Sequence, residues 1–166
     1  MSVTDSDLER AGATLGDLLM QHECTIATAE SCTGGWVAKV LTDRAGSSAY
    51  VQGGLVTYSN AAKHELLGVP EQNLEAFGAV SEPVVRDMVA GTLAVTGVDV
   101  AVAISGVAGP GGGSDEKPVG TVWFAWGSSR DTTEAKRKRF EGDRDAVRRQ
   151  AVLYALQGVS EYVKRS

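Results

Sequence analysis

The sequence predicts an α/β fold: a three-layer α/β/α single domain, residues 1–166, with a mixed, mostly parallel central sheet. Segments of helical periodicity alternate with short apolar segments of strand length, which is typical of parallel strands joined by helices. The segment Val98–Ser105 is almost entirely apolar, as expected of a central strand covered on both faces. The last two strand-like segments have no helix between them, and this predicts a hairpin and therefore a mixed sheet.

The first half of the chain contains three predicted helices and two predicted strands. The N-terminal helix has apolar residues at helical spacing from Leu8 to Leu19, with Thr4 or Asp5 as its N-cap. Asn60 and Gly68 are expected to begin and end the third helix. The other predicted segments are a buried strand at 24–29, a helix at 33–43 with Trp36, Val37, Val40 and Leu41 facing inward, and a strand at 49–59 bulged at Gly53-Gly54.

The second half begins with a helix whose ends are clearly marked. Ser81 is its expected N-cap, Pro83 lies in its first turn and Gly97 ends it. The basic cluster 135–140 is interpreted as the solvated face of an edge strand, where lysines discourage pairing between sheet edges. The remaining predicted segments are strands at 119–127 and 133–140, joined by a turn at 127–130, and a helix from about Asp143 with Val147, Ala151, Tyr154 and Tyr162 inward.

Composition and charge exclude several functional classes. The chain has 166 residues, a net charge of −5 and a pI near 5.0, and this acidic balance argues against a nucleic-acid partner held by phosphate contacts. No apolar run reaches the roughly 18 residues of a membrane span, and the first twenty residues lack the features of a secretory signal. Two cysteines are too few for a disulfide framework or a zinc site. We therefore expect a cytoplasmic protein with no membrane partner.

Candidate catalytic groups are expected where strands end and loops enter helices. The stretch "ESCTGG" places Ser31 at the end of a strand, directly before a glycine-rich turn that opens a helix. A hydroxyl at this point can act as a nucleophile beside free backbone N–H groups. Alternatively, Ser31, Cys32 or Thr33 only caps the helix. Cys32 is a rival nucleophile, but a thiolate requires a base such as histidine, and the chain has only His22 and His64.

Because histidine is so scarce, the base that activates Ser31 is expected to be another residue type. Tyr58 ends the second strand and Lys63 falls in the first turn of the next helix. A lysine desolvated in a cleft has a lowered pKa and can accept a proton, while a tyrosine can relay that proton or orient the lysine. The other interpretation is a solvated lysine and a core tyrosine. The glycine-rich segment 105–120 lacks both nucleotide-binding glycine patterns, so it is either a ligand-contacting loop or a mobile one.

Long, ordered motifs along the chain resemble those of one known family. They are "TAESCTGG" (28–35), "AGSSAY" (45–50), "VTYSNAAK" (56–63), "GAVSEP" (78–83), "ISGVAGPGGGSDEKPVGTVWFAW" (104–126) and "GDRDAVRRQA" (142–151). From about Leu8 to Tyr162 the chain resembles the CinA C-terminal domain family, whose stand-alone members are nicotinamide-nucleotide amidases. Larger members carry an additional N-terminal domain, which this chain is expected to lack.

The resemblance implies hydrolysis of the carboxamide of nicotinamide mononucleotide, a small-molecule substrate, to nicotinate mononucleotide and ammonia. It implies Ser31 as the nucleophile and Lys63 with Tyr58 as the general base. The substrate-binding residues that it implies are Thr33, Gly34, Ser48, Asn60, Gly106 and Arg144. Among them Arg144 suits a 5′-phosphate, because it is positively charged. The implied mechanism requires no cofactor and no metal, and family members commonly form homo-oligomers.

A second hypothesis is a non-catalytic nucleotide-binding or interaction module that uses the same cleft. The presence of Ser31, Tyr58 and Lys63 together favours the enzyme, because a protein that only binds has no use for a base beside a hydroxyl. A third hypothesis, an oxidoreductase of the short-chain-dehydrogenase type, is suggested by the tyrosine and lysine. It fails because the glycine fingerprint is missing and the spacing of the two residues is wrong.

Overall fold

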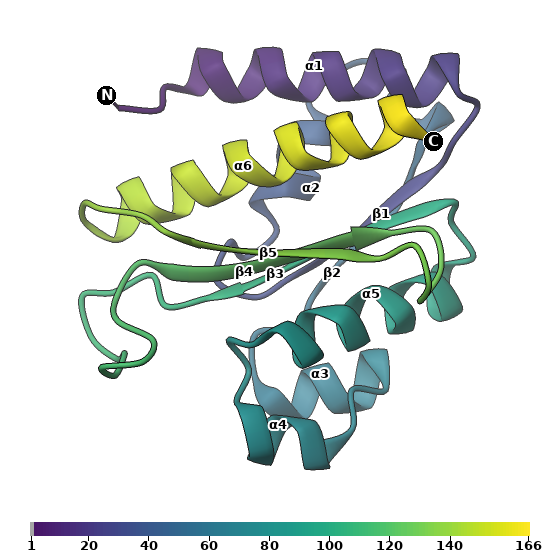
Figure 1. Cartoon of the computed structure of the whole chain (residues 1–166). Coiled ribbons are helices and arrows are strands. Elements are labelled where there is room, and N and C mark those ends of the chain that lie inside the picture. The colour runs from purple at the N-terminus through teal and green to yellow at the C-terminus, as the bar shows by residue number, and fades with distance from the viewer. Residues whose placement is uncertain (1) are drawn as a thin grey trace.

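The computed structural model describes residues 2–166 and contains a five-stranded sheet (Figure 1). Its strand order is β2-β1-β3-β4-β5. The strands are β1 (Ile26–Glu30), β2 (Val51–Val56), β3 (Val100–Gly106), β4 (Thr121–Gly127) and β5 (Glu134–Arg139). β1 pairs in parallel with β2 and β3, whereas β4 is antiparallel to both β3 and β5. All strands except β4 therefore point in one direction, which confirms the predicted mixed, mostly parallel sheet.

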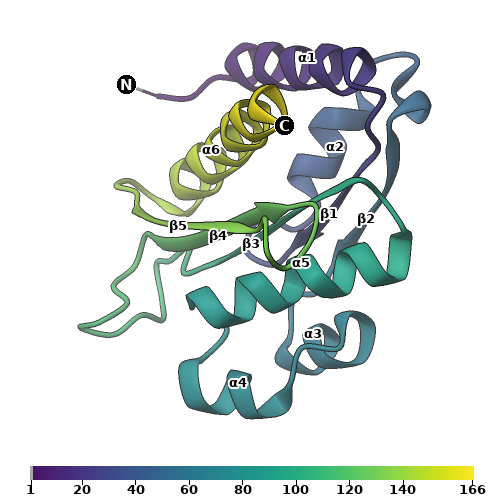
Figure 2. The same cartoon turned by 45° about the vertical axis from the view of Figure 1, so that its right-hand side comes forward.

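Helices cover both faces of the sheet and complete the three predicted layers (Figure 1). One face carries α1 (Asp5–Gln21), α2 (Trp36–Thr42) and α6 (Arg144–Arg165); the other carries α5 (Glu82–Thr96), with α3 (Asn60–Leu67) and α4 (Glu71–Phe77). Figure 2 shows that α5 lies directly against the sheet and that α3 and α4 pack on its outer side. Within residues 2–166, no helix combines the length and apolar character that a membrane crossing needs.

The central strands divide their side chains between two hydrophobic cores. On β3, Val102 and Ile104 pack in the core beneath α1, α2 and α6, whereas Ala101 and Ala103 pack in the core against α5. The α5 side of the sheet is rich in alanine. Besides the two alanines of β3, it contains Ala27, Ala29 and Ala125. Because alanine side chains are short, they leave room for α5 close to the sheet. Because successive side chains of a strand point to opposite faces of the sheet, only every second residue can face α3 at the sheet edge.

Polar N-cap side chains bond to the first turns of α1, α3 and α6 close to where the sequence predicts, whereas Ser81 occupies the predicted N-cap position of α5 without such a bond. Thr4 caps α1 and Asp143 caps α6. In α3 the N-cap is Ser59, whose hydroxyl accepts a hydrogen bond from a first-turn N–H at 3.0 Å. Asn60 is instead the first helical residue, so the prediction of Asn60 as the N-cap is wrong by one position. Gly68 ends α3 with a φ of +68°, as predicted.

Three local features differ from the predictions. The helix α4 was not predicted, because it has only seven residues and Pro70 stands at its N-cap in place of a capping side chain. The register of β2 against β1 shifts between Val51 and Gly53, slightly before the predicted bulge. The loop of the last hairpin runs through Thr133 and is longer than the predicted turn.

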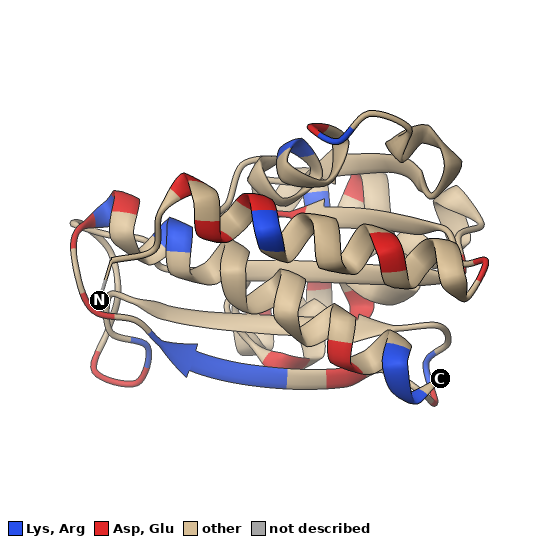
Figure 3. Ribbon diagram, turned by 90° about the horizontal axis from the view of Figure 1, so that it is seen from above, with Lys and Arg blue, Asp and Glu red and all other residues tan. Residues whose placement is uncertain are grey.

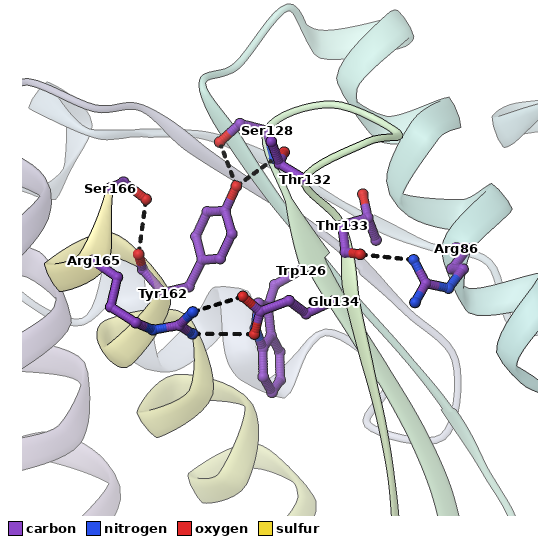
Figure 4. Close-up of polar contacts among 9 residues, drawn as sticks. All are labelled: Arg86, Trp126, Ser128, Thr132, Thr133, Glu134, Tyr162, Arg165 and Ser166. Atoms are coloured by element: carbon purple, nitrogen blue, oxygen red, sulfur yellow. Dashed lines mark hydrogen bonds and ion pairs between the residues drawn. The ribbon is translucent and has the colours of Figure 1, made fainter.

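The β4–β5 hairpin is tied to the neighbouring helices at the end away from the candidate site (Figure 4). The Glu134 carboxylate accepts two hydrogen bonds from the Arg165 guanidinium, at 2.8 and 3.1 Å, and this contact holds the pKa of Glu134 below its ordinary value. The Tyr162 hydroxyl accepts from the Ser128 N–H at 3.0 Å. Arg86 of α5 donates to a carbonyl of the hairpin loop at 2.7 Å. These contacts connect the edge of the sheet to both helical layers.

The edge strand β5 has a basic, exposed surface. Its residues 136–139 are all Lys or Arg and all lie exposed. Figure 3 shows them as a continuous blue run along the edge of the sheet. The arrangement confirms the interpretation of this cluster as a solvated edge strand, since repelling cations discourage the addition of another strand.

Candidate active site

The carboxyl ends of β1, β2 and β3 meet at one edge of the sheet, and Ser31 lies there. Glu30 on β1 pairs with Val56 on β2 and with Ile104 on β3, so Ser31 is the first residue beyond β1. The Ser31 N–H donates to the Ile104 carbonyl at 2.9 Å and keeps the residue in line with the strand. Because side chains alternate along a strand, Glu30 faces α2 and Ser31 faces α3 on the other side.

Lys63 of α3 reaches Ser31 from that other side of the sheet. Its Nζ lies 3.0 Å from Ser31 Oγ. The same nitrogen donates to the main-chain carbonyls of Thr57, at 2.8 Å, and Tyr58, at 3.2 Å. Lys63 is 1% exposed and Ser31 is 7% exposed. The hydroxyl and the amine therefore form a pair that is almost shielded from water, with backbone oxygens as their neighbours.

Burial lowers the pKa of Lys63 to about 8, from an ordinary value of 10.5, because desolvation disfavours the ammonium ion. The Cys32 side chain acts in the opposite direction as a smaller influence. The hydrogen-bond partners of this amine are a hydroxyl and two carbonyls, and none is a carboxylate. Roughly a tenth of the amine is therefore neutral at pH 7, and a neutral amine can accept a proton.

Neither Ser31 nor Cys32 caps the helix that follows. The Glu30 carboxylate does so, accepting hydrogen bonds from the N–H groups of Val37, at 2.9 Å, and Ala38, at 3.0 Å. Cys32 is buried in the core beneath α1, α2 and α6. Burial, and secondly the Glu30 charge, raise the pKa of the Cys32 thiol to about 12, so it stays protonated at neutral pH. The Ser31 hydroxyl is the group that faces the Lys63 amine.

The turn after Ser31 begins with buried residues and contains backbone N–H groups that have no hydrogen-bond acceptor in the described part of the chain. Within residues 2–166, the N–H groups of Cys32 and Thr33 donate to no acceptor. The turn is closed by the Gly34 N–H, which donates to the Ser31 carbonyl at 3.0 Å. Arg148 of α6 donates to the carbonyls of Cys32, at 3.0 Å, and Thr33, at 3.4 Å. Free N–H groups beside a nucleophile can stabilise a negatively charged oxygen.

The backbone and the side chain of Tyr58 have different partners. Its carbonyl accepts from Lys63 Nζ and, at 3.4 Å, from Ser31 Oγ. Tyr58 is 62% exposed, and its phenol hydroxyl accepts a hydrogen bond from Arg144 at 3.4 Å. Arg144 also donates to the Gly109 carbonyl at 2.8 Å. The phenol therefore lies toward the glycine-rich loop, and the contact that orients Lys63 comes from the Tyr58 backbone.

Other predicted substrate contacts gather at the same edge of the sheet. Gly34 lies in the turn after Ser31 with a φ of +60°, which favours glycine. Gly106 ends β3, and the exposed Asn60 begins α3. The Thr33 hydroxyl points inward and donates to Glu30 at 2.7 Å. Thr33 is 0% exposed, so its side chain is not available to a ligand, and only its backbone N–H remains without an acceptor.

Ser48 does not lie with the other predicted substrate contacts at the carboxyl edge of the sheet. It belongs to the single-turn 3-10 helix Ser47–Ala49, which lies just before β2. Because Val51 of β2 is opposite Ile26 of β1, Ser48 lies at the amino edge of the sheet. The length of β1, about 17 Å at a rise of about 3.3 Å per residue, separates that edge from Ser31. Membership of a motif does not reveal which end of a strand its residues occupy.

Two residues of this region, Glu30 and Arg148, were not predicted as functional. A glutamate at the end of a strand predicted to be buried was a signal for Glu30, because a buried carboxylate needs hydrogen-bond partners. Glu30 is indeed 0% exposed. Arg148 lies four residues after Arg144 and therefore on the same side of α6, which was a second signal. Across the described part of the chain, no three His, Cys, Asp or Glu side chains form a group that could hold a metal ion.

Comparison with known proteins identifies the family. The sequence model of the CinA C-terminal domain matches residues 8–163. The chain belongs to the CinA C-terminal domain family. Similar proteins include the nicotinamide-nucleotide amidohydrolase PncC of Escherichia coli K12, 57% identical over 155 residues that cover 93% of this chain and 94% of that protein. The protein of the same name from Pseudomonas putida is 53% identical over 145 residues, which cover 87% and 90%.

Solved structures of CinA proteins have the same fold. A CinA superfamily protein from Klebsiella pneumoniae matches with a TM-score of 0.92 and 41% identity, over 96% of this chain and 99% of that one. A competence/damage inducible protein from Agrobacterium tumefaciens matches with a TM-score of 0.92 and 39% identity, over 99% of both chains. The similarity also extends to a longer relative. A putative competence-damage inducible protein of Symbiobacterium thermophilum is 52% identical over 95% of this chain but only 39% of its own length.

Proposed function

We propose that the whole chain is one nicotinamide-nucleotide amidohydrolase domain, which converts nicotinamide mononucleotide to nicotinate mononucleotide and ammonia. The observation that carries this proposal is the buried contact of 3.0 Å between Lys63 Nζ and Ser31 Oγ, together with a lysine pKa of about 8. A hydroxyl beside a partly neutral amine is suited to nucleophilic attack on a carboxamide. The substrate is inferred from the similar amidohydrolases of Escherichia coli and Pseudomonas putida.

In the first step, Ser31 Oγ attacks the carboxamide carbon and Lys63 takes the proton of the hydroxyl. A neutral amine has two N–H bonds and one lone pair. The carbonyls of Thr57 and Tyr58 can accept both N–H bonds, which leaves the lone pair for the Ser31 O–H. The negative charge that develops on the carboxamide oxygen is received by the N–H groups of Cys32 and Thr33.

In the second step, the C–N bond breaks and the protonated Lys63 gives its proton to the departing ammonia. Water then attacks the acyl-enzyme, with the neutral Lys63 taking a proton from it. When the ester bond breaks, that proton returns to Ser31 Oγ, so enzyme and protons are restored. Every proton transfer passes through the Lys63 amine, which is already in contact with Ser31 Oγ.

The nucleotide part of the substrate is assigned to the carboxyl edge of the sheet. Arg144 is exposed and binds the 5′-phosphate, while Gly34, Gly106 and Asn60 line the approach to Ser31. Ser48 is left out of this assignment because it lies at the opposite edge. We also expect the chain to form a homo-oligomer and to act in the cytoplasm, where its two free cysteines suit reducing conditions.

Ammonia release from nicotinamide mononucleotide by the purified chain tests the proposal. Ser31→Ala should lower kcat by at least about a thousandfold while the fold and nucleotide binding persist, because only a hydroxyl is lost. Cys32→Ala is the matched control, and it should keep most of the activity since its thiol is buried and protonated. Equal losses in both variants would contradict Ser31 as the nucleophile. Nucleotide binding without ammonia release would instead identify a non-catalytic binding module.

A further inference from the structure

Glu30 is a buried carboxylate that the proposed reaction does not use. It lies next to Ser31 in the chain but faces the other side of the sheet. Oε1 accepts hydrogen bonds from the Thr33 hydroxyl, at 2.7 Å, and the Val37 N–H, at 2.9 Å. Oε2 accepts from the Thr28 hydroxyl, at 3.1 Å, and the Ala38 N–H, at 3.0 Å. Both ends of the turn between Ser31 and α2 are thereby tied to one carboxylate.

Arg148 holds the same turn from its carbonyl side. Its Nε donates to the Cys32 carbonyl at 3.0 Å and its Nη2 to the Thr33 carbonyl at 3.4 Å. The guanidinium also lies against the Trp36 ring, 5.6 Å from its centre. A carboxylate that binds donors and a guanidinium that binds acceptors therefore act on one short segment, Ser31–Gly35.

These contacts determine the direction of the free N–H groups. A peptide group is planar and trans, so the Cys32 carbonyl and the Thr33 N–H point in opposite directions. Because Arg148 binds the Cys32 carbonyl, the Thr33 N–H points away from Arg148. In the same way, the Ser31 carbonyl binds the Gly34 N–H, and the Cys32 N–H points away from that contact.

We propose that Glu30 and Arg148 are positioning residues that hold the turn after Ser31 so that the N–H groups of Cys32 and Thr33 receive the oxyanion of the reaction. The inference rests on the proposed amidohydrolase function. Neither side chain touches the substrate. Arg148 acts on the turn through the carbonyls of Cys32 and Thr33, and Glu30 acts through the Thr33 hydroxyl and the first N–H groups of α2. The oxyanion exists only in the transition state and the tetrahedral intermediate, so the effect of these residues belongs to kcat and not to KM.

The Arg148 variants test the proposal with a matched control. Arg148→Ala should lower kcat for ammonia release by about 10²-fold, with KM changed less than about threefold, because one oxyanion donor is worth about 10²–10³ in kcat. Arg149→Ala is the control: Arg149 also lies against the Trp36 ring, 5.1 Å from its centre, but it bonds to Asp5 and Asp145 and not to the turn. Its kcat should stay near that of the wild type.

Two further readouts separate positioning from a general structural role. Added methylguanidine should restore part of the kcat of Arg148→Ala, because it can occupy the vacated space and bind the Cys32 carbonyl. The pH at which the rate rises should be the same in Arg148→Ala and the wild type, because the Lys63 partners are unchanged. A raised KM with normal kcat would overturn the proposal, since Arg148 would then bind substrate.

Glu30→Gln tests the contribution of Glu30 to the position of the turn. Glutamine keeps the shape, but its NH₂ group would face a donor, either the Val37 or the Ala38 N–H. We expect a kcat loss of about 10-fold or more at nearly constant KM. A crystal structure of Arg148→Ala gives a result that does not depend on activity: the 32–33 peptide should be rotated. An unrotated peptide would contradict the positioning role of Arg148. A wild-type enzyme that releases no ammonia would contradict only the proposed function.

Discussion

At the residue scale, the site depends on a lysine whose amine is placed where water is largely excluded. Lys63 Nζ has three oxygen neighbours, but none carries a formal charge that would offset the ammonium. Desolvation therefore dominates, and the pKa falls to about 8. Three hydrogen bonds keep the nitrogen beside Ser31 in either protonation state. A surface lysine would keep its charge and would be a poor base at neutral pH.

The rate should therefore rise with pH as Lys63 loses its proton. In the proposed mechanism the neutral amine is the active form, so kcat/KM for ammonia release should increase through a single ionisation near pH 8 and level off above it. Lys63→Arg and Lys63→Ala should both lose about 10²–10⁴-fold in kcat, because arginine does not deprotonate in proteins and alanine has no base. Steady-state kinetics between pH 6 and about pH 10 measure this.

His64→Ala is the control for this pH dependence. The His64 Nδ1 lies 2.8 Å from the Val69 carbonyl and its Nε2 lies 3.4 Å from Glu71, so the ring is directed away from Ser31. Its removal should leave the pH profile unchanged. An active Lys63→Arg enzyme, or a pH limb that disappears only in His64→Ala, would show that Lys63 is not the base.

At the element scale, the position of Lys63 depends on how α3 packs against α5. Gly91 of α5 lies so close to the end of α3 that a Cβ atom there would be 1.9 Å from the Leu67 carbonyl oxygen. That oxygen belongs to the backbone and cannot rotate away as a flexible side chain would. The absence of a side chain at Gly91 thus lets α3 lie where its lysine reaches the carboxyl end of β1.

Gly91→Ala should consequently reduce both stability and activity. Alanine favours a helix over glycine by up to about 1 kcal/mol, whereas forcing an extra methyl into a packed interior typically costs about 1–3 kcal/mol. The steric effect is the larger, so the free energy of unfolding should fall. We expect kcat to fall as well, because α3 must shift and carries Lys63 with it. Chemical denaturation and ammonia release measure the two effects.

Gly53→Ala is the matched control for the added methyl group. No atom lies within 4 Å of the Cβ position at Gly53, which is in β2. Its kcat should remain near the wild-type value. If Gly91→Ala were instead more stable than the wild type and fully active, helix propensity would outweigh the contact and α3 would not depend on this glycine.

The elements that the sequence predicted have a recognisable local pattern, such as residues that mark a helix end or a short apolar run. Ser81 and Gly97 delimit α5, and the apolar run of β3 has no competing interpretation as a helix because it is short. The helix α4 has a proline at its N-cap and one buried apolar residue, Leu74, so neither capping nor periodicity marks it. Its position depends on packing against α5, which no local pattern records.

At the scale of the whole molecule, the site combines segments from different parts of the chain. The contact of Ser31 with Lys63 was predictable, because a hydroxyl at a strand end and a nearby lysine have a chemical meaning together. The contact of the Tyr58 carbonyl with Lys63 was not predictable, since sequence patterns describe side chains and not the direction of a backbone oxygen. The position of Ser48 at the other edge of the sheet was not predictable, because a motif does not state which sheet edge it occupies. Arg148 meets Cys32 only once α6 has folded over the sheet.

The charge of the molecule opposes an anionic substrate, whereas the charge near the site attracts it. The net charge is −5 at pH 7. Arg144 nevertheless presents an exposed guanidinium at the carboxyl edge, beside the Tyr58 hydroxyl. At physiological ionic strength, interactions between exposed charges fade beyond about 8 Å. Nearby Arg144 should therefore matter more to a bound phosphate than distant carboxylates do.

Arg144→Ala should raise KM for nicotinamide mononucleotide much more than for the riboside, which has no phosphate. Added salt should raise KM for the mononucleotide in the wild type, because it screens the local attraction, but should have little effect in Arg144→Ala. Arg130→Ala is the matched control. It changes the net charge equally, but Arg130 lies in the hairpin loop at the opposite edge, near Asp87. If Arg130→Ala had the same effect as Arg144→Ala, the overall charge would control binding and Arg144 would not be the phosphate ligand.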